Sequence, residues 1–393
     1  MSKENKISPL SENFYQSTRK KLLNLIHEKN LDGFLVTNPA NIFYFTGFFY
    51  VTNERPSGFF LSKNNKSKLF IPLLEKENAE NVNIDEVNIY EEFPGEINPY
   101  SFMANNLSEN NIGTDIKNVD ILNLLKNKFN KLDLNTGLEN FRFEKLDEEI
   151  KLIFKASKYA DLALENLKEN AKELINQHVD ERTLVKICTE FAKKKMLKEL
   201  SSEFDETPCN VVATIHSGPR GAFPHGKSLS RIPKKNETLI CGVGACVGGL
   251  YAESGVTFIL GEPNKDQENI IKAMKKVNDV AVENLKEGNV CEEVNKAASE
   301  VYREYNLTNY VRHRIGHGMG FEGHEAPWLS PGDKTKLKEN MVFSNEPGIY
   351  RPNIDGYRTI SSMIVGKSRG TQISNFLDKS IDNRIINLNW GRK

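Results

Sequence analysis

A long amphipathic helix that begins near Asp147 is the feature that most restricts how this chain can fold. Asp147 stands where an N-cap is expected, and the acidic residues Glu148 and Glu149 follow it. The apolar residues of this segment recur on one helical face, at positions 150, 153, 156, 160, 163 and 167. Because 393 residues are too many for one ordinary core, the helix is expected to open a second domain. We predict domains at residues 1–145 and 146–393.

Shorter patterns before this helix indicate a small α/β domain. Helical spacing over residues 14–29 leads into the strand GFLVT, which is expected to stop at a turn formed by Asn38 and Pro39. Further strands are predicted over residues 58–61 and 68–71. Strands that alternate with helices in this way are typical of an α/β unit.

The second domain combines helices with a glycine-rich, β-rich region. Helices are predicted over residues 181–197 and 264–285, and strand-like segments dominate over 208–260. We therefore predict an α+β fold overall, in which helices flank an antiparallel sheet in the second domain.

The charge balance and the cysteines restrict the partners and the compartment. Lys plus Arg and Asp plus Glu both number 53, so nothing favours nucleic acid or an anionic membrane, and a small molecule or peptide is the expected substrate.

The five cysteines lack CxxC spacing, which argues against a disulfide framework and a thiolate zinc site. The first residues lack a secretory signal, and the most apolar stretch, residues 42–51, is too short to span a membrane. A soluble, cytoplasmic protein is predicted.

Five of the seven histidines fall in two short segments rich in glycine and proline. IHSGPRGAFPHG holds His216 and His225, and RHRIGHGMGFEGHEAP holds His313, His317 and His324. Such a cluster indicates a site, because glycines let backbone and substrate approach closely. His216 also has a structural interpretation, in which it caps or packs a turn. Glu322 and Glu325 are expected to be exposed charges.

Three segments resemble the signatures of the pita-bread peptidases, in the order and at the spacing found in prolidases: SGPRGAFPHG, RHRIGHGMGFEGHEAPWLSPGD and KENMVFSNEPGIY. NIFYFTGFFYVTNERP resembles the N-terminal domain of creatinase-type proteins. The chain is thus similar, over nearly its whole length, to the family of prolidase, aminopeptidase P and creatinase. The resemblance implies a small N-terminal creatinase-type domain, a C-terminal pita-bread domain, and a homodimer in which Arg55 reaches the neighbouring active site. Arg55 as a structural ion-pair partner is the alternative.

The metal-ligand positions implied by the resemblance are degenerate. Metal-dependent members use Asp, Asp, His, Glu and Glu, and the matching positions here are Gly242, Glu253, His317, Glu346 and Ile360. Glycine and isoleucine offer no donor, so a two-metal cluster is not expected. The first expectation is a site without a cofactor, as in creatinase. The alternative is one divalent ion, Zn, Mn or Fe, held by Glu253, His317 and Glu346.

The resemblance also implies roles for individual side chains. His225 matches the general base that activates water for attack on a C–N carbon. His313 and His324 would steady the oxyanion or protonate the leaving nitrogen. Glu253 and Glu346 would hold a cationic substrate group, or Glu253 would act as a covalent nucleophile. The predicted catalytic residues are His225, Glu253, Glu346, His324, His317 and His313, and the predicted substrate-binding residues are Arg55 and Arg358.

Three classes of function follow from this sequence. The first prediction is a metal-independent hydrolase of C–N bonds in a small cationic or zwitterionic nitrogen compound, similar to creatinase or ectoine hydrolase. The second is an Xaa-Pro dipeptidase or aminopeptidase with a single metal. The third is a non-catalytic pita-bread module that binds a peptide or protein. The clustered histidines and glutamates favour an enzyme over the module.

Overall fold

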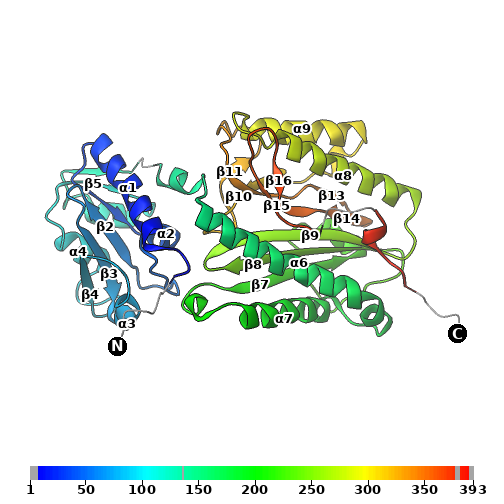
Figure 1. Ribbon diagram of the computed structural model, residues 1–393, viewed down its shortest axis with the longest axis horizontal. Helices are drawn as coiled ribbons and strands as arrows, with labels where there is room; N and C mark the ends of the chain where they lie inside the picture. Colours follow the sequence, from blue (N-terminus) through cyan, green and yellow to red (C-terminus); the bar gives the residue numbers. More distant parts are fainter. Residues whose placement is uncertain (1–7, 135–136, 377–380, 389–393) are drawn as a thin grey trace. The chain divides into compact units, whose positions relative to one another are not determined.

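The computed structural model describes residues 8–134, 137–376 and 381–388 of the chain (Figure 1). Internal contacts divide the chain into two units. One unit comprises Met1–Arg142 together with Ser201–Thr207, and the other comprises Phe143–Leu200 and Pro208–Lys393. The predicted boundary after residue 145 lies just beyond this division, and nothing in the sequence predicts that Ser201–Thr207 groups with the first unit.

A mixed sheet with the strand order β4-β3-β2-β1-β5-β6 forms the centre of the first unit. Strand β1 pairs antiparallel with β2 and parallel with β5. Helix α1 buries one face, which includes Phe14, Leu22 and Ile26. The elements are α1 (Glu12–Glu28), β1 (Gly33–Val36), α2 (Pro39–Thr46), β2 (Gly58–Ser62), β3 (Ser67–Pro72), α3 (Lys76–Ala79), β4 (Glu86–Tyr90), α4 (Pro99–Asn105), β5 (Asn111–Thr114), α5 (Val119–Leu125) and β6 (Lys131–Asp133).

A helix begins where the sequence predicts a turn at Asn38 and Pro39. The Asn38 side chain caps α2 by accepting a hydrogen bond from the Asn41 N–H at 3.0 Å, and Pro39 is the first helical residue. The helix ends at Thr46, and its C-cap residue is Gly47, whose φ of +76° is left-handed. Proline suits the first helical position because its φ is already helical and its missing N–H would be unpaired there. Much of the apolar stretch 42–51 therefore folds as a short buried helix.

The second unit begins with α6, a helix of 30 residues. It starts at Asp147, but its N-cap residue is Leu146. The Leu146 N–H donates to the Glu149 carboxylate at 2.8 Å. The third helical residue thus supplies the cap, and Asp147 does not act as the N-cap.

The remaining elements of the second unit form one large sheet, a two-stranded ribbon and the covering helices. They are α7 (Glu181–Glu199), β7 (Asn210–Ser217), β8 (Thr238–Val247), β9 (Leu250–Leu260), α8 (Lys265–Asn284), α9 (Cys291–Glu304), β10 (Gly316–Gly318), β11 (Glu325–Leu329), β12 (Val342–Asn345), β13 (Gly348–Arg351), β14 (Asp355–Arg358), β15 (Ile360–Ile364), β16 (Thr371–Gln372) and β17 (Ile385–Ile386).

The main path of the large sheet has the strand order β11-β10-β12-β15-β9-β8-β7, and its neighbours pair antiparallel. Helix α6 packs against β8 and β9, α7 against β7, and α9 against β11 (Figure 1). Apolar residues of α8 and α9 share a core with β12 and β15, including Met274, Phe343 and Met363. This architecture confirms the predicted α+β fold class.

The described helices and the cysteines bear on the membrane and disulfide predictions. Within the described residues, no helix is both long enough and apolar enough to cross a membrane. The five cysteines are free thiols, and four of them are buried.

Candidate active site and metal centre

Neighbouring strands of the large sheet bring together residues that are far apart in the sequence. Glu253 lies on β9, His317 lies on β10, and Glu346 directly follows β12. Strand β15 lies between β12 and β9. The Ser362 hydroxyl of β15 accepts a hydrogen bond from the Glu253 N–H at 2.8 Å and donates to the Glu253 carbonyl at 2.9 Å. The sheet topology therefore fixes where this acidic site lies.

The His317 imidazole is fully buried and faces two carboxylates. Its Nδ1 lies 3.0 Å from the Gly318 carbonyl oxygen, which can only accept a hydrogen bond, so Nδ1 carries a proton. Its Nε2 lies 3.2 Å from Oε1 of Glu346 and 3.8 Å from Oε2 of Glu253. Despite these distances, Nε2 has no partner with hydrogen-bond geometry among the described residues. A fixed tautomer that points a second nitrogen at carboxylates is the usual arrangement of a metal-binding histidine.

The pKa values of the two carboxyl groups are moved in opposite directions. Burial alone would raise the pKa of Glu346, but His317, with smaller effects from His313 and Arg358, lowers it to about 2. Burial raises the pKa of Glu253 and outweighs the opposing charge of His317. Burial would lower the pKa of His317, but Glu346 and Glu253 raise it. The site therefore favours positive charge between its two carboxylates.

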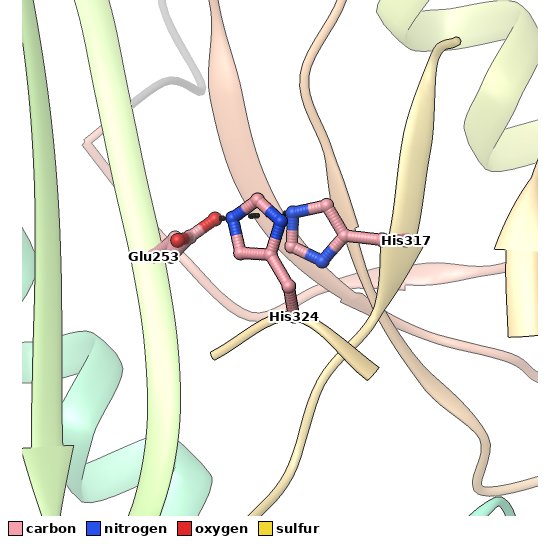
Figure 2. Close-up of side chains that lie close together, drawn as sticks. All are labelled: Glu253, His317 and His324. Atoms are coloured by element: carbon pink, nitrogen blue, oxygen red, sulfur yellow. Dashed lines mark ion pairs between the residues drawn. The ribbon is translucent and has the colours of Figure 1, made fainter. Parts of the chain in front are cut away.

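His324 adds a second imidazole to this site. Its ring stacks on that of His317, with ring centroids 3.7 Å apart and an interplanar angle of 20°. One possible ligand atom each from Glu253, His317 and His324 lies within 4.8 Å of the others. Figure 2 shows these three side chains close together. Glu346, the third ligand in the sequence-based prediction, is not in this group, although it lies nearer to His317 Nε2 than Glu253 does. His324 and Glu346 are thus both candidates to complete a ligand set with Glu253 and His317.

The two degenerate ligand positions pack against each other. Gly242 on β8 and Ile360 on β15 are both register partners of Gly255 on β9. A Cβ atom placed on Gly242 would lie 3.0 Å from Nη2 of Arg358 and 3.0 Å from Cδ1 of Ile360. A guanidinium and an alkyl group therefore fill the space beside position 242, and neither can bind a cation.

His225 lies in the connection between β7 and β8, and the carbonyl groups of its two neighbours, Pro224 and Gly226, are held. Arg358 Nη1 donates to the Pro224 carbonyl at 2.9 Å. The Nε2 of the buried His216 contacts the Gly226 carbonyl and, because that oxygen only accepts, donates to it. This contact fits the structural interpretation of His216. The His225 side chain itself is exposed.

His313 is engaged at both ring nitrogens. Its Nδ1 donates to the Arg314 carbonyl at 2.7 Å, so its Nε2 accepts from the Tyr350 hydroxyl at 2.8 Å. Burial lowers the pKa of His313 and of His324, and the nearby charge of His225 adds to both effects. The three histidines therefore lie around one site. Tyr350 belongs to a segment that the sequence singles out, but nothing in the sequence places its hydroxyl beside His313.

The two predicted substrate-binding arginines lie in different units. Arg358 belongs to the second unit and is 8% exposed, and its Nε has no hydrogen-bond partner among the described residues. Arg55 belongs to the first unit, where its Nε lies 2.6 Å from the Glu92 carboxylate and its Nη1 pairs with Glu54. Its reach to a neighbouring active site stays a prediction.

The expectation that Glu325 is an exposed charge is wrong. Glu325 is 5% exposed, and its Oε1 lies 2.9 Å from the ammonium group of the equally buried Lys145. Glu325 directly follows His324, and the Tyr251 N–H donates to the Gly320 carbonyl at 2.9 Å in the same loop. These contacts hold the loop that carries His324, and the sequence gives no sign of them because Lys145 is 180 positions away.

Comparison with known proteins identifies relatives of both parts of the chain. Residues 151–375 match the model of metallopeptidase family M24, and residues 19–153 match that of the creatinase/prolidase N-terminal domain. An Xaa-Pro dipeptidase of Pyrococcus furiosus is 28% identical over 359 residues, which cover 90% of this chain and 97% of the relative. An uncharacterised peptidase of Staphylococcus epidermidis is 28% identical over 356 residues, covering 88% and 95%. The crystal structure of a prolidase from Thermococcus sibiricus superposes with a TM-score of 0.79 at 26% identity, covering 93% and 98%.

The match to a metallopeptidase family contradicts the expectation of a site without a cofactor. That expectation rests on the missing donors at Gly242 and Ile360. It fails because the remaining donors still suffice for one ion: Glu253 and His317 lie together, with His324 and Glu346 beside them. Losing the donors for a second metal therefore does not remove the donors for one.

Proposed function

Because the chain belongs to metallopeptidase family M24 and carries a creatinase/prolidase N-terminal domain, we propose that it is an Xaa-Pro dipeptidase that works with one divalent metal ion. Membership of this family makes it a hydrolase of C–N bonds. The Xaa-Pro dipeptidase and the prolidase among its relatives support a dipeptide substrate. The creatinase-like prediction, with its cationic substrate, has no such support.

The environment of His317 Nε2 is the observation that carries this proposal. In the neutral tautomer with its proton on Nδ1, His317 turns an unprotonated, fully buried Nε2 toward carboxylate oxygens, which is costly unless a positive charge lies between them. Two carboxylates lie within 3.8 Å of the same atom. A divalent cation would satisfy the nitrogen and both acids together.

The number of acids in the site argues for one ion. Only Glu253 and Glu346 remain of the four carboxylates that the family resemblance places around two metals, and two negative charges balance one divalent cation. Zn, Mn and Fe all accept a mixture of imidazole and carboxylate ligands.

Glu253, His317 and Glu346 would hold this ion, and His324 lies close enough to contribute a further nitrogen. A divalent ion at this place supplies Lewis-acid polarisation of the scissile carbonyl. With Glu253 engaged as a ligand, we favour attack by water over a covalent intermediate on that residue.

The protein's own residues would supply proton transfer and positive charge around the ion. His225, exposed and held through its backbone, is the proposed general base. The buried Arg358 guanidinium provides a fixed positive charge that favours a developing oxyanion. His225, after it takes a proton from the attacking water, is the proposed donor of that proton to the leaving nitrogen, and His313 holds the Tyr350 hydroxyl in place beside the site.

Three further predictions remain part of this proposal. We propose domains at residues 1–145 and 146–393, a homodimer, and a contact of Arg55 with a substrate carboxylate in the neighbouring subunit. Light scattering of the purified protein tests the dimer. Mixing an Arg55→Met chain with a His225→Ala chain tests the contact, because mixed dimers would regain activity in one of their two sites.

Metal analysis combined with a substrate panel tests the proposed function. Untagged protein is analysed by elemental mass spectrometry, then assayed with Xaa-Pro dipeptides, creatine and ectoine before and after treatment with a chelator. We expect one ion per chain, and dipeptide hydrolysis that the chelator abolishes and added Zn, Mn or Fe restores. Hydrolysis of creatine or ectoine that survives the chelator would contradict the proposal. Tight peptide binding without any turnover would favour the non-catalytic module.

A further inference from the structure

We propose that Glu181 is a positioning residue that sets His225 over the active site by closing the loop of residues 218–229, here called the His225 loop. This inference rests on the proposed function, in which His225 takes part in catalysis. Glu181 itself is the first residue of α7 and does not belong to the group of site residues described above.

One buried carboxylate fastens both ends of the His225 loop. Glu181 is fully buried. Its Oε1 accepts hydrogen bonds from the Ser217 N–H at 2.9 Å and the Ser217 hydroxyl at 2.7 Å, just before the loop begins. Its Oε2 accepts from the N–H of Leu229, the last loop residue, at 3.0 Å. The two ends of the loop are therefore held by the two oxygens of a single side chain.

A second layer of contacts supports this carboxylate. The Glu181 N–H donates to the Arg231 carbonyl at 2.9 Å. The Arg231 guanidinium donates to the Ser217 hydroxyl at 2.5 Å and pairs with both oxygens of Glu237. A buried anion needs such donors and a nearby cation to remain charged. The arrangement is rigid because every group in it is already engaged.

The contacts inside the loop extend this rigidity to His225. Arg358 donates to the carbonyl of Pro224 and His216 donates to the carbonyl of Gly226, as described above, so the neighbours of His225 on both sides are held. The loop is thus fixed at its two ends and at its tip, while the His225 side chain remains exposed. A general base must be held to within a fraction of an ångström to work well, and its support is commonly a shell of buried hydrogen bonds.

Glutamine at position 181 tests the role of the carboxylate with little change in volume. Its amide has one accepting oxygen for three donors, and its NH2 group would face the N–H of Ser217 or Leu229. For Glu181→Gln, we expect kcat for Xaa-Pro dipeptides to fall about 10- to 100-fold, KM to stay within about twofold and the metal content to be unchanged. The milder Ser217→Ala removes one of the three donors, and we expect kcat to fall about fivefold in the same direction.

Asp180→Ala is the matched control. Asp180 precedes Glu181 and caps α7 by accepting from the Thr183 N–H at 2.8 Å, without contacting the loop. The substitution should lower the melting temperature, as loss of an N-cap does, and leave kcat unchanged. If Asp180→Ala lowers kcat as much as Glu181→Gln at equal loss of stability, Glu181 has only a structural role and the inference is overturned.

Hydrogen exchange provides a readout that does not depend on the substrate. Peptides covering residues 216–230 should exchange faster in Glu181→Gln and Ser217→Ala than in wild type and Asp180→Ala, while peptides of α9 should be unchanged. Unchanged exchange in both loop variants would overturn the inference. Faster exchange in a protein whose wild type hydrolyses no Xaa-Pro dipeptide would support the fastening of the loop and contradict only the proposed function.

Discussion

Glu346 and His324 are expected to contribute unequally to the proposed metal site. We expect Glu346→Gln to weaken metal binding about 100-fold and His324→Ala less than tenfold, because only Glu346 contributes a charge that balances the ion. Titration calorimetry of the metal-free protein with Zn and with Mn measures both affinities. Glu322→Gln, on the loop of His324 but outside the group of possible ligands, is the control. A larger loss for His324→Ala would identify the imidazole as the ligand instead.

A single carboxyl group on α6 should make stability depend on pH. Burial raises the pKa of Asp161 to about 6, although the hydrogen bond from the Asn375 N–H at 2.7 Å opposes the rise. The folded state holds this proton more tightly than the unfolded chain does. The protonated Asp161 therefore makes its full contribution to the free energy of unfolding below about pH 4, and that contribution is lost as the pH rises through about 6. The difference from the ordinary pKa corresponds to roughly 3 kcal/mol at pH 8.

Asp161→Asn should therefore remove part of the alkaline loss of stability. We expect the variant to match wild type near pH 4 and to be more stable by up to roughly 3 kcal/mol at pH 8, measured by urea denaturation at both pH values. Asp279→Asn, an exposed residue paired with Lys275, should show no such difference. Equal stability of Asp161→Asn and wild type at pH 8 would show that burial does not raise the pKa of Asp161.

At the scale of elements, β14 meets the start of the His225 loop at two glycines. A Cβ atom on Gly356 would collide with the Gly221 carbonyl. The atoms that it would meet belong to the backbone, so no flexible side chain could move aside to relieve the collision. We expect Gly356→Ala to lower the free energy of unfolding by about 3 kcal/mol, as measured by denaturant titration. Gly244→Ala on β8, where the nearest atom would lie 3.5 Å away, should change it by less than about 0.5 kcal/mol. Similar losses for both variants would contradict this close approach.

Helices whose apolar residues recur at regular helical spacing could be predicted from the sequence. Contacts between residues far apart in the chain could not. The helices α1, α6, α7 and α8 lie where apolar spacing places them, because each buries one face of its own surface. The helix at Asn38 and Pro39 was missed because asparagine and proline also favour turns. Of the site, the sequence indicated the histidines and glutamates, but not the hydrogen bonds of Glu181 or Tyr350, since these depend on how α7 and β13 pack.

At the scale of the whole molecule, metal binding and stability should be linked. If the folded second unit binds the ion and the unfolded chain does not, each tenfold increase of free metal above the dissociation constant adds about 1.4 kcal/mol. Differential scanning calorimetry should show a melting temperature that rises with Zn or Mn and falls with a chelator. His317→Ala should abolish this dependence, and a response unchanged in that variant would place the ion elsewhere.

The packing of Ile360 against Gly242 and Gly255 also limits how a second metal position could be introduced. Aspartate restored at position 242 alone would meet the Ile360 methyl and the Arg358 guanidinium, because a Cβ there already lies 3.0 Å from each. Glutamate restored at position 360 alone would bring a carboxylate into the site without the second cation to balance it. Either change alone is therefore unfavourable. Positions 242 and 360 are thus coupled, and a second metal position could be built into this protein only by changing both residues together.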